Sequence, residues 1–360
     1  MRDKNKKIKV IVAMSGGVDS SVTAALLKKA GFSVAGIMGK FWTEKKKNSN
    51  NSEKKARQVA QKIGIPFYAV NFEKEFRKKV VDYFLNDYKQ GNTPNPCIVC
   101  NKEIKFGLLL KEAKKMNADF LATGHYSRLQ REILNLKLQT PNKYRIKLFK
   151  GKDKAKDQSY FLWQLSQSQL KNVLFPVGNY TKPEVRSLAK KFDLPVAETP
   201  ESQEVCFVDG LTSDFLKKYL KTKPGKIVDI KGNLIGQHNG LWFYTIGQRR
   251  GLDISQGPWF VVKKDFKKNN LIVSKNEKDL LKKEFIAVNV NWILRQNLPI
   301  NAKVKIRYKS NFAEAKILKH KKNSVKVIFK NPQKAITPGQ SAVFYKGKEL
   351  LGGGVIVDSK

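Results

Sequence analysis

Cysteine is scarce in this sequence. Only three cysteines, Cys97, Cys100 and Cys206, occur among the 360 residues. A scaffold stabilised by disulfides would need several pairs in a chain of this size, so that class of protein is excluded. The three thiols therefore call for an explanation from chemistry or from packing.

Long apolar runs are also missing from the sequence. No stretch approaches the roughly 20 apolar residues that a membrane-spanning helix needs. The basic segment 1–9 and the apolar segment 8–14 resemble a signal peptide only superficially, because the apolar part is short and leads directly into a glycine turn. We therefore expect a cytoplasmic protein with no membrane partner.

Acidic residues are few compared with basic ones. The chain has 30 Asp and Glu against 71 Lys and Arg, which gives a formal net charge of +41. Such an excess favours a polyanionic partner such as RNA. A general enrichment in lysine would produce the same excess, since basic residues are spread along the whole chain and Lys greatly outnumbers Arg.

The first strong pattern is an apolar strand followed by a glycine pair and a helix. Apolar residues fill 10–13, Gly16-Gly17 interrupts the run, and helical spacing continues from Ser20 to a stop at Gly31. Two glycines let a ligand approach the backbone closely, and the unpaired N–H groups of the helix start attract an anion. The turn lacks the Gly-Lys-Ser/Thr and Gly-x-Gly-x-x-Gly motifs. It resembles the pyrophosphate-binding loop of enzymes that split ATP to adenylate a carbonyl oxygen.

The N-terminal half predicts an α/β fold with a Rossmann-like parallel sheet, because strands and helices alternate. We expect an exposed loop at 43–52, a Pro-rich turn at 92–96, a hairpin at 128–150 and a helix that begins after a capping box at Thr181 and Glu184. The alternating pattern has strands at 10–13, 33–38, 67–72 and 119–123, and helices at 20–29, 56–63, 73–88 and 105–116.

The remainder of the chain predicts two smaller β-rich domains. Short strands at 226–230, 234–236, 241–246, 259–264 and 271–274 indicate a small, mostly β central domain. Strands at 303–308, 313–318, 324–329, 341–345 and 354–357 indicate a C-terminal antiparallel β-barrel. The expected domains are 1–210 for nucleotide binding, 211–283 for the central domain and 284–360 for the barrel.

Cys97 and Cys100 form a C-x-x-C pair, which fits several kinds of site. The pair could belong to a zinc site completed by Cys206 and His125, to a redox dithiol, to an iron–sulfur site, or to a nucleophile with its neighbour. Lys102 and Lys105, together with a helix N-terminus, would lower the thiol pKa and favour a nucleophile at Cys100. An adenylating loop combined with two reactive cysteines points to sulfur insertion.

The sequence resembles the bacterial tRNA-specific 2-thiouridylases over nearly its whole length. The motifs that carry the resemblance are Ser15-Gly-Gly-Val-Asp-Ser20, Asn92-Thr-Pro-Asn-Pro96, Cys100-Asn-Lys-Glu-Ile-Lys-Phe106, Thr123-Gly-His-Tyr126, Lys156-Asp-Gln-Ser-Tyr160, Glu201-Ser-Gln-Glu-Val-Cys206 and Tyr244-Thr-Ile-Gly-Gln-Arg-Arg250. The resemblance implies that Cys206 carries a persulfide and that Cys100 attacks it to leave a disulfide. The sulfur, supplied by a donor protein, then enters C2 of an adenylated wobble uridine.

The resemblance also implies that domain 1–210 is catalytic, that domain 211–283 contacts tRNA, and which residues bind each substrate. Magnesium is expected with ATP, because the phosphates need charge neutralisation. Three of these assignments have an alternative to RNA contact. His125 could be a hydrogen-bonded core residue, 156–158 a solvated turn, and 307–308 part of an ordinary strand. ATP is assigned to Ala13, Met14, Ser15, Gly16, Gly17, Val18, Asp19, Ser20, Met38, Gly39 and Gly124, and tRNA to Asn95, Pro96, Cys97, His125, Lys156, Asp157, Gln158, Arg307, Tyr308 and Gln340.

Cys97 departs from the pattern of this family, in which many members carry an aspartate that is assigned proton transfer at the base. The substitution creates a cluster of cysteines and leaves a first alternative open, an iron–sulfur-dependent thiolase that uses Cys97, Cys100 and Cys206. A second alternative is a non-catalytic RNA-binding protein with structural zinc, which predicts tight zinc binding and no ATP turnover.

Overall fold

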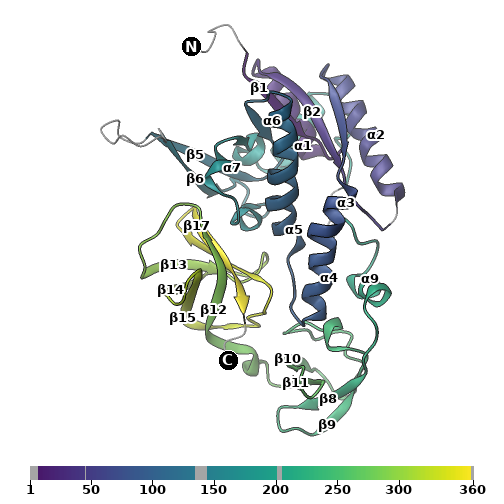
Figure 1. Ribbon diagram of the computed structural model, residues 1–360, viewed down its shortest axis with the longest axis vertical. Coiled ribbons are helices and arrows are strands. Elements are labelled where there is room, and N and C mark those ends of the chain that lie inside the picture. Colours follow the sequence, from purple (N-terminus) through teal and green to yellow (C-terminus); the bar gives the residue numbers. More distant parts are fainter. Residues whose placement is uncertain (1–6, 45, 134–143, 201–204, 358–360) are drawn as a thin grey trace. The chain divides into compact units, whose positions relative to one another are not determined.

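The fold is described by a computed structural model that covers residues 7–44, 46–133, 144–200 and 205–357 (Figure 1). The chain divides into two compact units, and both are discontinuous in sequence. The first unit comprises Met1–Val80, Cys97–Asp209 and Lys348–Leu351, and the second comprises Val81–Pro96, Gly210–Gly347 and Gly352–Lys360. Within the described ranges, no helix combines the length and apolar character needed to cross a membrane.

The first unit is built on a five-stranded sheet whose strands all run parallel, as the sequence predicts. Val10, Ile11 and Val12 of the central strand are completely buried, which is typical of a parallel sheet covered on both faces. The strand order is β3 (Phe67–Asn71), β2 (Ser33–Lys40), β1 (Lys9–Ala13), β4 (Phe120–Ala122) and β7 (Val173–Leu174) (Figure 1).

Three helices pack on the sheet through a shared apolar core: α1 (Val18–Lys29), α2 (Lys46–Lys62) and α8 (Lys182–Lys191). The loop expected at 43–52 is wrong from residue 46 onward, because α2 begins there. Apolar periodicity marks only the half of this helix that packs on the core, and its polar first half carries no such signal. The capping box of α8 is confirmed, since the Thr181 N–H donates to Glu184 at 2.6 Å.

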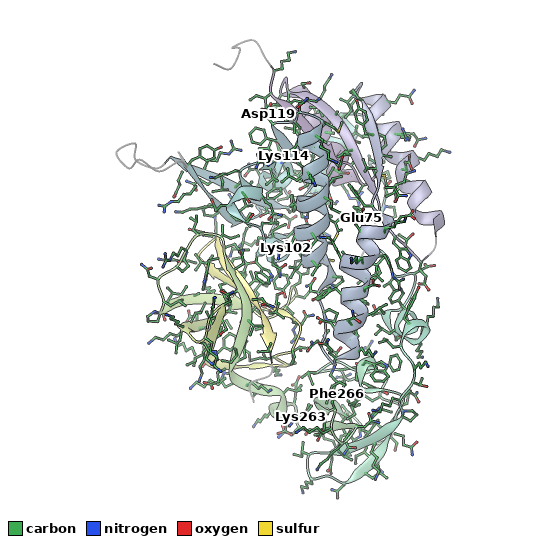
Figure 2. The ribbon with its side chains drawn as sticks, in the orientation of Figure 1. Glu75, Lys102, Lys114, Asp119, Lys263 and Phe266 are labelled. Atoms are coloured by element: carbon green, nitrogen blue, oxygen red, sulfur yellow. The ribbon has the colours of Figure 1, made fainter. Side chains whose placement is uncertain are left out.

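The cysteine-bearing helix begins earlier than the sequence indicates. Helical structure starts at Pro96, not near Lys105, and runs through α5 (Pro96–Val99), a π-helical segment (Cys100–Leu109) and α6 (Leu110–Lys115), with Lys102 and Lys114 labelled in Figure 2. A π-helix displaces backbone carbonyls from their usual partners. The Gln169 side chain compensates by donating to the carbonyls of Lys102 at 3.1 Å and Phe106 at 2.9 Å.

The other elements of this region are a hairpin and several short helices. The predicted hairpin is confirmed, with β5 (Ser127–Ile133) antiparallel to β6 (Tyr144–Lys150); its expected tip at Thr140-Pro141-Asn142 lies outside the described residues. The helix expected at 73–88 is confirmed in outline. Its segments are α3 (Glu73–Phe76), a π-helical turn (Arg77–Val81) and α4 (Asp82–Lys89), and the remaining short helices are Ser159–Leu162, α7 (Gln167–Leu170) and Pro176–Asn179.

The second unit contains a small sheet in its central part, with α9 (Thr212–Tyr219) before it. The strand expected at 241–246 is wrong, because Leu241–Phe243 forms a 3-10 turn after Gly240. That turn buries Leu241 and Tyr244 in the apolar core without any strand pairing. The strand order is β10 (Phe260–Asp265), β11 (Asn270–Ser274), β8 (Gly225–Asp229) and β9 (Leu234–His238).

The C-terminal part forms the predicted antiparallel barrel, which closes where β12 pairs with β17. The sequence missed β12, and it placed Arg307 and Tyr308 on a strand that ends at Lys305. A short 3-10 helix, Glu277–Leu280, precedes the barrel. The strands of the barrel, in order, are β12 (Leu281–Trp292), β15 (Ser324–Lys334), β14 (Ala313–Lys319), β13 (Ile300–Lys305), β16 (Ser341–Lys346) and β17 (Glu349–Val357).

Candidate active site

The glycine turn lies at the carboxyl end of β1 and leads into α1. Gly16 has a φ of +76°, and a Cβ there would meet the backbone oxygen of Ser52 at 2.4 Å, so only glycine fits. The Ser20 hydroxyl accepts from the Ser15 N–H at 3.2 Å and donates to the Gly17 carbonyl at 3.1 Å. The loop is therefore held open at the helix start, where the first N–H groups have no intrahelical partner and can bind phosphate.

Gly124 is brought against this loop by the pairing of β4 with β1. A Cβ at Gly124 would meet the backbone of Asp19 and Ser20 at 2.8 Å, which explains why glycine occupies the position. Gly39, at the end of β2, faces aromatic rings instead, since its Cβ would meet Phe41 at 2.5 Å. The edge of the sheet where ligands bind in such folds thus collects the residues assigned to ATP.

Asp19 makes two contacts that the sequence did not reveal. Its Oδ1 accepts from the Tyr126 hydroxyl and from the Lys182 ammonium, both at 2.7 Å. Lys182 is the first residue of α8, and its side chain is only 9% exposed. The capping box at Thr181 located the start of this helix but gave no signal of the loop that the helix faces.

The three cysteines belong to the first unit, and their thiols interact electrostatically. Cys97 and Cys206 are exposed whereas Cys100, the first residue of the π-helical segment, is buried. Cys100 interacts with both of the other thiols. Asn101 supports this position, because its side-chain amide donates to the Phe161 carbonyl at 3.1 Å. The structure thus groups the two cysteines predicted to exchange sulfur, together with Cys97.

The prediction that the thiols have lowered pKa values is wrong. Burial raises the pKa of Cys100 to about 12 and that of Cys206 to about 11, and burial also raises the pKa of Cys97. Cys97 and Cys206 keep accessible surface, yet protein atoms surround their sulfurs closely enough to disfavour thiolates. The Lys105 ammonium opposes the shift in all three. Cys100 lies inside the helix rather than before it, so the expected help from a helix N-terminus is lost.

The three cysteines and His125 are the candidate metal ligands of this region. Across the described part of the chain, no group of three His, Cys, Asp or Glu side chains has the arrangement of a metal site. The three thiols, as placed, therefore do not fit an iron–sulfur cluster, and with His125 they do not fit a zinc site.

His125 is buried, and Thr123 fixes its ring. The Thr123 hydroxyl and His125 Nδ1 are 2.7 Å apart, and the ring contacts Phe106 and Phe175. Burial, reinforced by the nearby Lys105 ammonium, lowers the pKa of His125 well below its usual value. The imidazole is therefore neutral at pH 7 and acts as a hydrogen-bonding group rather than a cation.

The segment Lys156–Gln158 supports the same region. Gln158 accepts from the Tyr126 N–H at 3.0 Å through its side chain. Asp157 accepts from the N–H of Gly151 at 3.0 Å and from the N–H and hydroxyl of Ser159 at 3.1 and 3.0 Å. These polar side chains are thus fixed within the fold and are not a freely solvated turn.

Further residues assigned to tRNA lie in the second unit. Asn95 and Pro96 end the Pro-rich turn, and Gln340 from the barrel donates to the Thr93 carbonyl in that turn at 2.8 Å. Arg307 and Tyr308 follow β13 on a loop, which excludes the alternative that they are ordinary strand residues.

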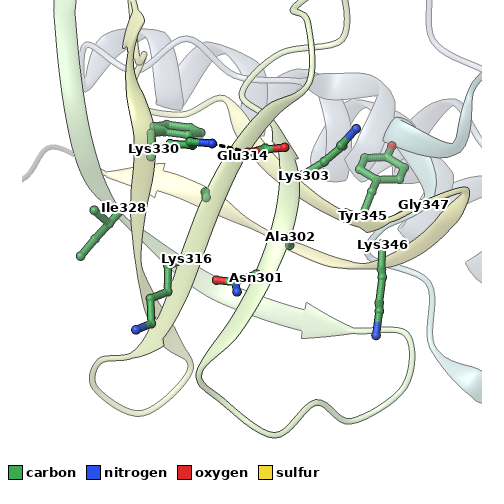
Figure 3. Close-up of a pocket in the computed structure, with 12 residues that line it drawn as sticks. Asn301, Ala302, Lys303, Glu314, Lys316, Ile328, Lys330, Tyr345, Lys346 and Gly347 are labelled. Carbon is green, nitrogen blue, oxygen red and sulfur yellow. Dashed lines mark ion pairs between the residues drawn. The ribbon is translucent and has the colours of Figure 1, made fainter.

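The barrel also has a hollow on its outer face with a volume of about 610 Å³ (Figure 3). Lys303, Lys316, Lys330 and Lys346 line it, and Glu314 forms an ion pair with Lys330 at 3.5 Å. None of the residues assigned to ATP, sulfur or tRNA is among its lining residues. Its lysine-rich face suits a polyanion.

Comparison with known proteins gives full-length matches. Three family models match in succession: the tRNA methyl transferase HUP domain over residues 8–210, the tRNA methyl transferase PRC-barrel domain over 213–275, and the aminomethyltransferase beta-barrel domain over 282–356. The tRNA-specific 2-thiouridylase MnmA of Halothermothrix orenii is 46% identical, with 98% of this chain and 99% of the relative covered. The chain belongs to the tRNA-specific 2-thiouridylase family.

A further member of the 2-thiouridylase family supports the assignment. MnmA of Clostridioides difficile is 43% identical, with 98% of each chain covered. Among solved structures, the U34-tRNA thiolase NcsA from Methanococcus maripaludis with its 4Fe–4S cluster matches at 20% identity and a TM-score of 0.35, covering 61% of this chain and 69% of that chain. That likeness is too low to carry an argument about the site.

Proposed function

We propose that this protein is an ATP-dependent tRNA 2-thiouridylase that replaces the C2 oxygen of the wobble uridine with sulfur. The single observation that carries the proposal is the grouping of an anion-binding glycine loop and interacting thiols, Cys100 and Cys206, within one compact unit. ATP activation of an oxygen and a sulfur nucleophile are the two parts that such a replacement requires.

Adenylation makes the uridine oxygen a leaving group. The loop Ala13–Ser20, with Met38, Gly39 and Gly124, binds ATP, and the C2 oxygen displaces pyrophosphate from the α-phosphate. Magnesium binds mainly through phosphate oxygens, since Mg²⁺ usually takes only one or two protein carboxylates in such sites. Asp19, the second residue of α1, is a carboxylate suited to that role.

Sulfur transfer uses both cysteines. A donor protein leaves a persulfide on Cys206, and the Cys100 sulfur attacks the Cys206 sulfur to form a disulfide and release hydrosulfide. The hydrosulfide attacks C2, and AMP leaves with the oxygen. The transferred sulfur gains two electrons as the two thiols are oxidised, so an external thiol must reduce the disulfide before the next cycle.

Each unit carries residues that we assign to tRNA binding. They are Asn95, Pro96, Cys97, His125, Lys156, Asp157, Gln158, Arg307, Tyr308 and Gln340. A neutral His125 suits hydrogen bonding to an extruded base. The high positive charge of the chain steers the tRNA toward the enzyme. Cytoplasmic location fits this substrate and stays a prediction.

Nucleoside mass spectrometry tests this function. The purified protein is incubated with unmodified tRNA, Mg²⁺-ATP and a persulfide donor, or in a parallel reaction with S-adenosylmethionine, and the digested tRNA is analysed for modified nucleosides. We expect 2-thiouridine together with equal amounts of AMP and pyrophosphate. Formation of a methylated nucleoside from S-adenosylmethionine, without pyrophosphate release, would instead favour the methyl transfer that the family-model descriptions name.

An iron–sulfur mechanism would need the third thiol, Cys97, as a ligand beside Cys100 and Cys206, and the three thiols as placed do not fit a cluster. Anaerobic purification and an absorption spectrum separate the two mechanisms. Full thiolation by a colourless, air-exposed protein supports the two-cysteine route. A brown protein that loses both colour and activity in air supports a cluster. Tight stoichiometric zinc without ATP turnover would favour the RNA-binding alternative.

A further inference from the structure

A buried positive charge from α8 lies beside the glycine turn, and no motif in the sequence assigns it a role. Lys182 is buried, and its ammonium lies 2.7 Å from Asp19 Oδ1. Asp19 is the second residue of α1, so the ammonium is adjacent to the first turn of the helix that follows the glycine pair. A lysine is rarely buried to this extent without a partner or a role.

Stability alone is a weak reason for this arrangement. The Asp19 side chain is 31% exposed, and its Oδ1 also accepts from the Tyr126 hydroxyl. An ion pair gains little net energy after desolvation, and an apolar residue of similar size often serves as well. The arrangement instead fixes the ammonium in one position, between Asp19 and the Tyr126 ring, whose centroid is 5.9 Å away.

The start of α8 supplies only this ammonium to the site. The N–H of Thr181 is used by Glu184 at 2.6 Å, and the N–H of Lys182 is used by Asp153 at 2.9 Å. These backbone donors are therefore occupied, so the charge that the start of α8 brings to the glycine turn is the Lys182 ammonium. A positive charge next to a helix N-terminus suits a phosphate group, since both favour negative charge.

We propose that Lys182 binds the β- and γ-phosphates of ATP and stabilises pyrophosphate as it leaves, and that Asp19 and Tyr126 position its ammonium. When the bond between the α-phosphorus and the bridging oxygen breaks, the electron pair stays with pyrophosphate. The fixed ammonium neutralises that charge, and no proton is transferred. This inference rests on the proposed adenylation and names the residue that receives its leaving group.

Calorimetric binding of inorganic pyrophosphate and of AMP, each with Mg²⁺, tests the inference. For Lys182→Met we expect pyrophosphate affinity to fall roughly tenfold to a hundredfold, the usual cost of losing a charged hydrogen bond, with AMP affinity within about twofold. Lys182→Arg keeps the charge and should retain most of the pyrophosphate affinity. Lys152→Met is the matched control, because Lys152 is exposed and pairs with Glu184 at 2.7 Å near the same helix.

The binding results for the Lys182 variants distinguish a phosphate-binding role from a structural one. Unchanged pyrophosphate binding by Lys182→Met overturns the inference, and so does an equal loss of AMP and pyrophosphate, which would mark a structural role. If Lys182→Met fails to fold, Lys182→Arg provides the test by itself. A hundredfold loss of pyrophosphate affinity in this variant, which keeps the positive charge, also overturns the inference. The failure of the proposed function gives a different pattern. In that case Lys182→Met still loses pyrophosphate binding selectively, but the native protein forms no 2-thiouridine.

Discussion

The side-chain amide of Gln340 donates to the backbone carbonyl of Thr93 at 2.8 Å, although the two residues are 247 positions apart. The Thr93 N–H donates to Pro338 at 2.9 Å, and its hydroxyl lies 3.3 Å from that of Thr245. Thr93 thus joins the Pro-rich turn to the barrel and to the Tyr244–Arg250 motif. Gln340, which is expected to contact RNA, is therefore held against the turn that ends in Asn95 and Pro96.

Replacement of Gln340 tests this support. Gln340→Ala removes the bond to Thr93, so we expect a loss of roughly 1 kcal/mol of stability by urea unfolding and weaker tRNA binding. Pyrophosphate binding should not change, because the glycine loop belongs to the other unit. Gln333→Ala is the control, since that exposed amide donates to the neighbouring carbonyls of Asn331 and Pro332 on its own strand. Equal effects of the two variants would contradict the account.

The raised pKa of Cys206 makes its reactivity depend on pH in a specific way. The thiolate reacts with iodoacetamide, and a pKa of about 11 keeps most of the thiol protonated at pH 7 to 9. Labelling of Cys206, followed by peptide mass spectrometry, should therefore rise about tenfold per pH unit up to pH 10. An ordinary thiol levels off above about pH 9. A plateau at that pH would show that burial does not hold the proton on Cys206.

Lys105 should make the thiols more reactive than burial alone allows, because its charge lowers the pKa of each of them. Lys105→Met should slow labelling of Cys206 at pH 8 by roughly two- to fivefold, as expected for a charge acting over several ångströms in a partly wet site. Lys102→Met is the matched control on the same helix, since none of the thiol shifts involves Lys102. A slower Lys102→Met, or an unchanged Lys105→Met, counts against this assignment.

Asp19 should matter for ATP and not for RNA. Asp19→Ala removes the carboxylate that holds Lys182 and Tyr126, so we expect AMP formation to fall roughly tenfold or more while tRNA affinity stays within about twofold. Product analysis and filter binding measure the two effects. Glu198→Ala is the control, because this exposed carboxylate pairs at 2.9 Å with Lys190 of α8, the helix that also carries Lys182. A parallel loss of tRNA binding in Asp19→Ala would point to misfolding.

The sequence predicted the fold well where apolar residues mark an element clearly. The apolar run before the glycine turn located β1 and α1, the alternation of strands and helices predicted the parallel sheet, and the capping box located α8. The polar start of α2 carried no periodicity, and β12 was missed altogether. Arg307 and Tyr308 were placed on a strand because alternation continues past Lys305, where the ladder of β13 ends.

The sequence identified most residues of the candidate site but did not predict the surroundings of their side chains. The loop residues and the two cysteines could be named from motifs, but thiol burial could not. Cys100 lies within a helix that begins at Pro96, and no local pattern in the sequence shows that the thiols of Cys100 and Cys206 are buried. Lys182 was missed for a similar reason, since only the packing of α8 against α1 brings its ammonium to Asp19.

The central claim is that Cys100 and Cys206 together deliver the sulfur. It is tested most directly by nucleoside mass spectrometry of tRNA treated with Cys100→Ser, Cys206→Ser or the native protein, each with Mg²⁺-ATP and a persulfide donor. We predict that both variants form no 2-thiouridine and bind tRNA as tightly as the native protein does. Normal amounts of 2-thiouridine from either serine variant would contradict the two-cysteine mechanism.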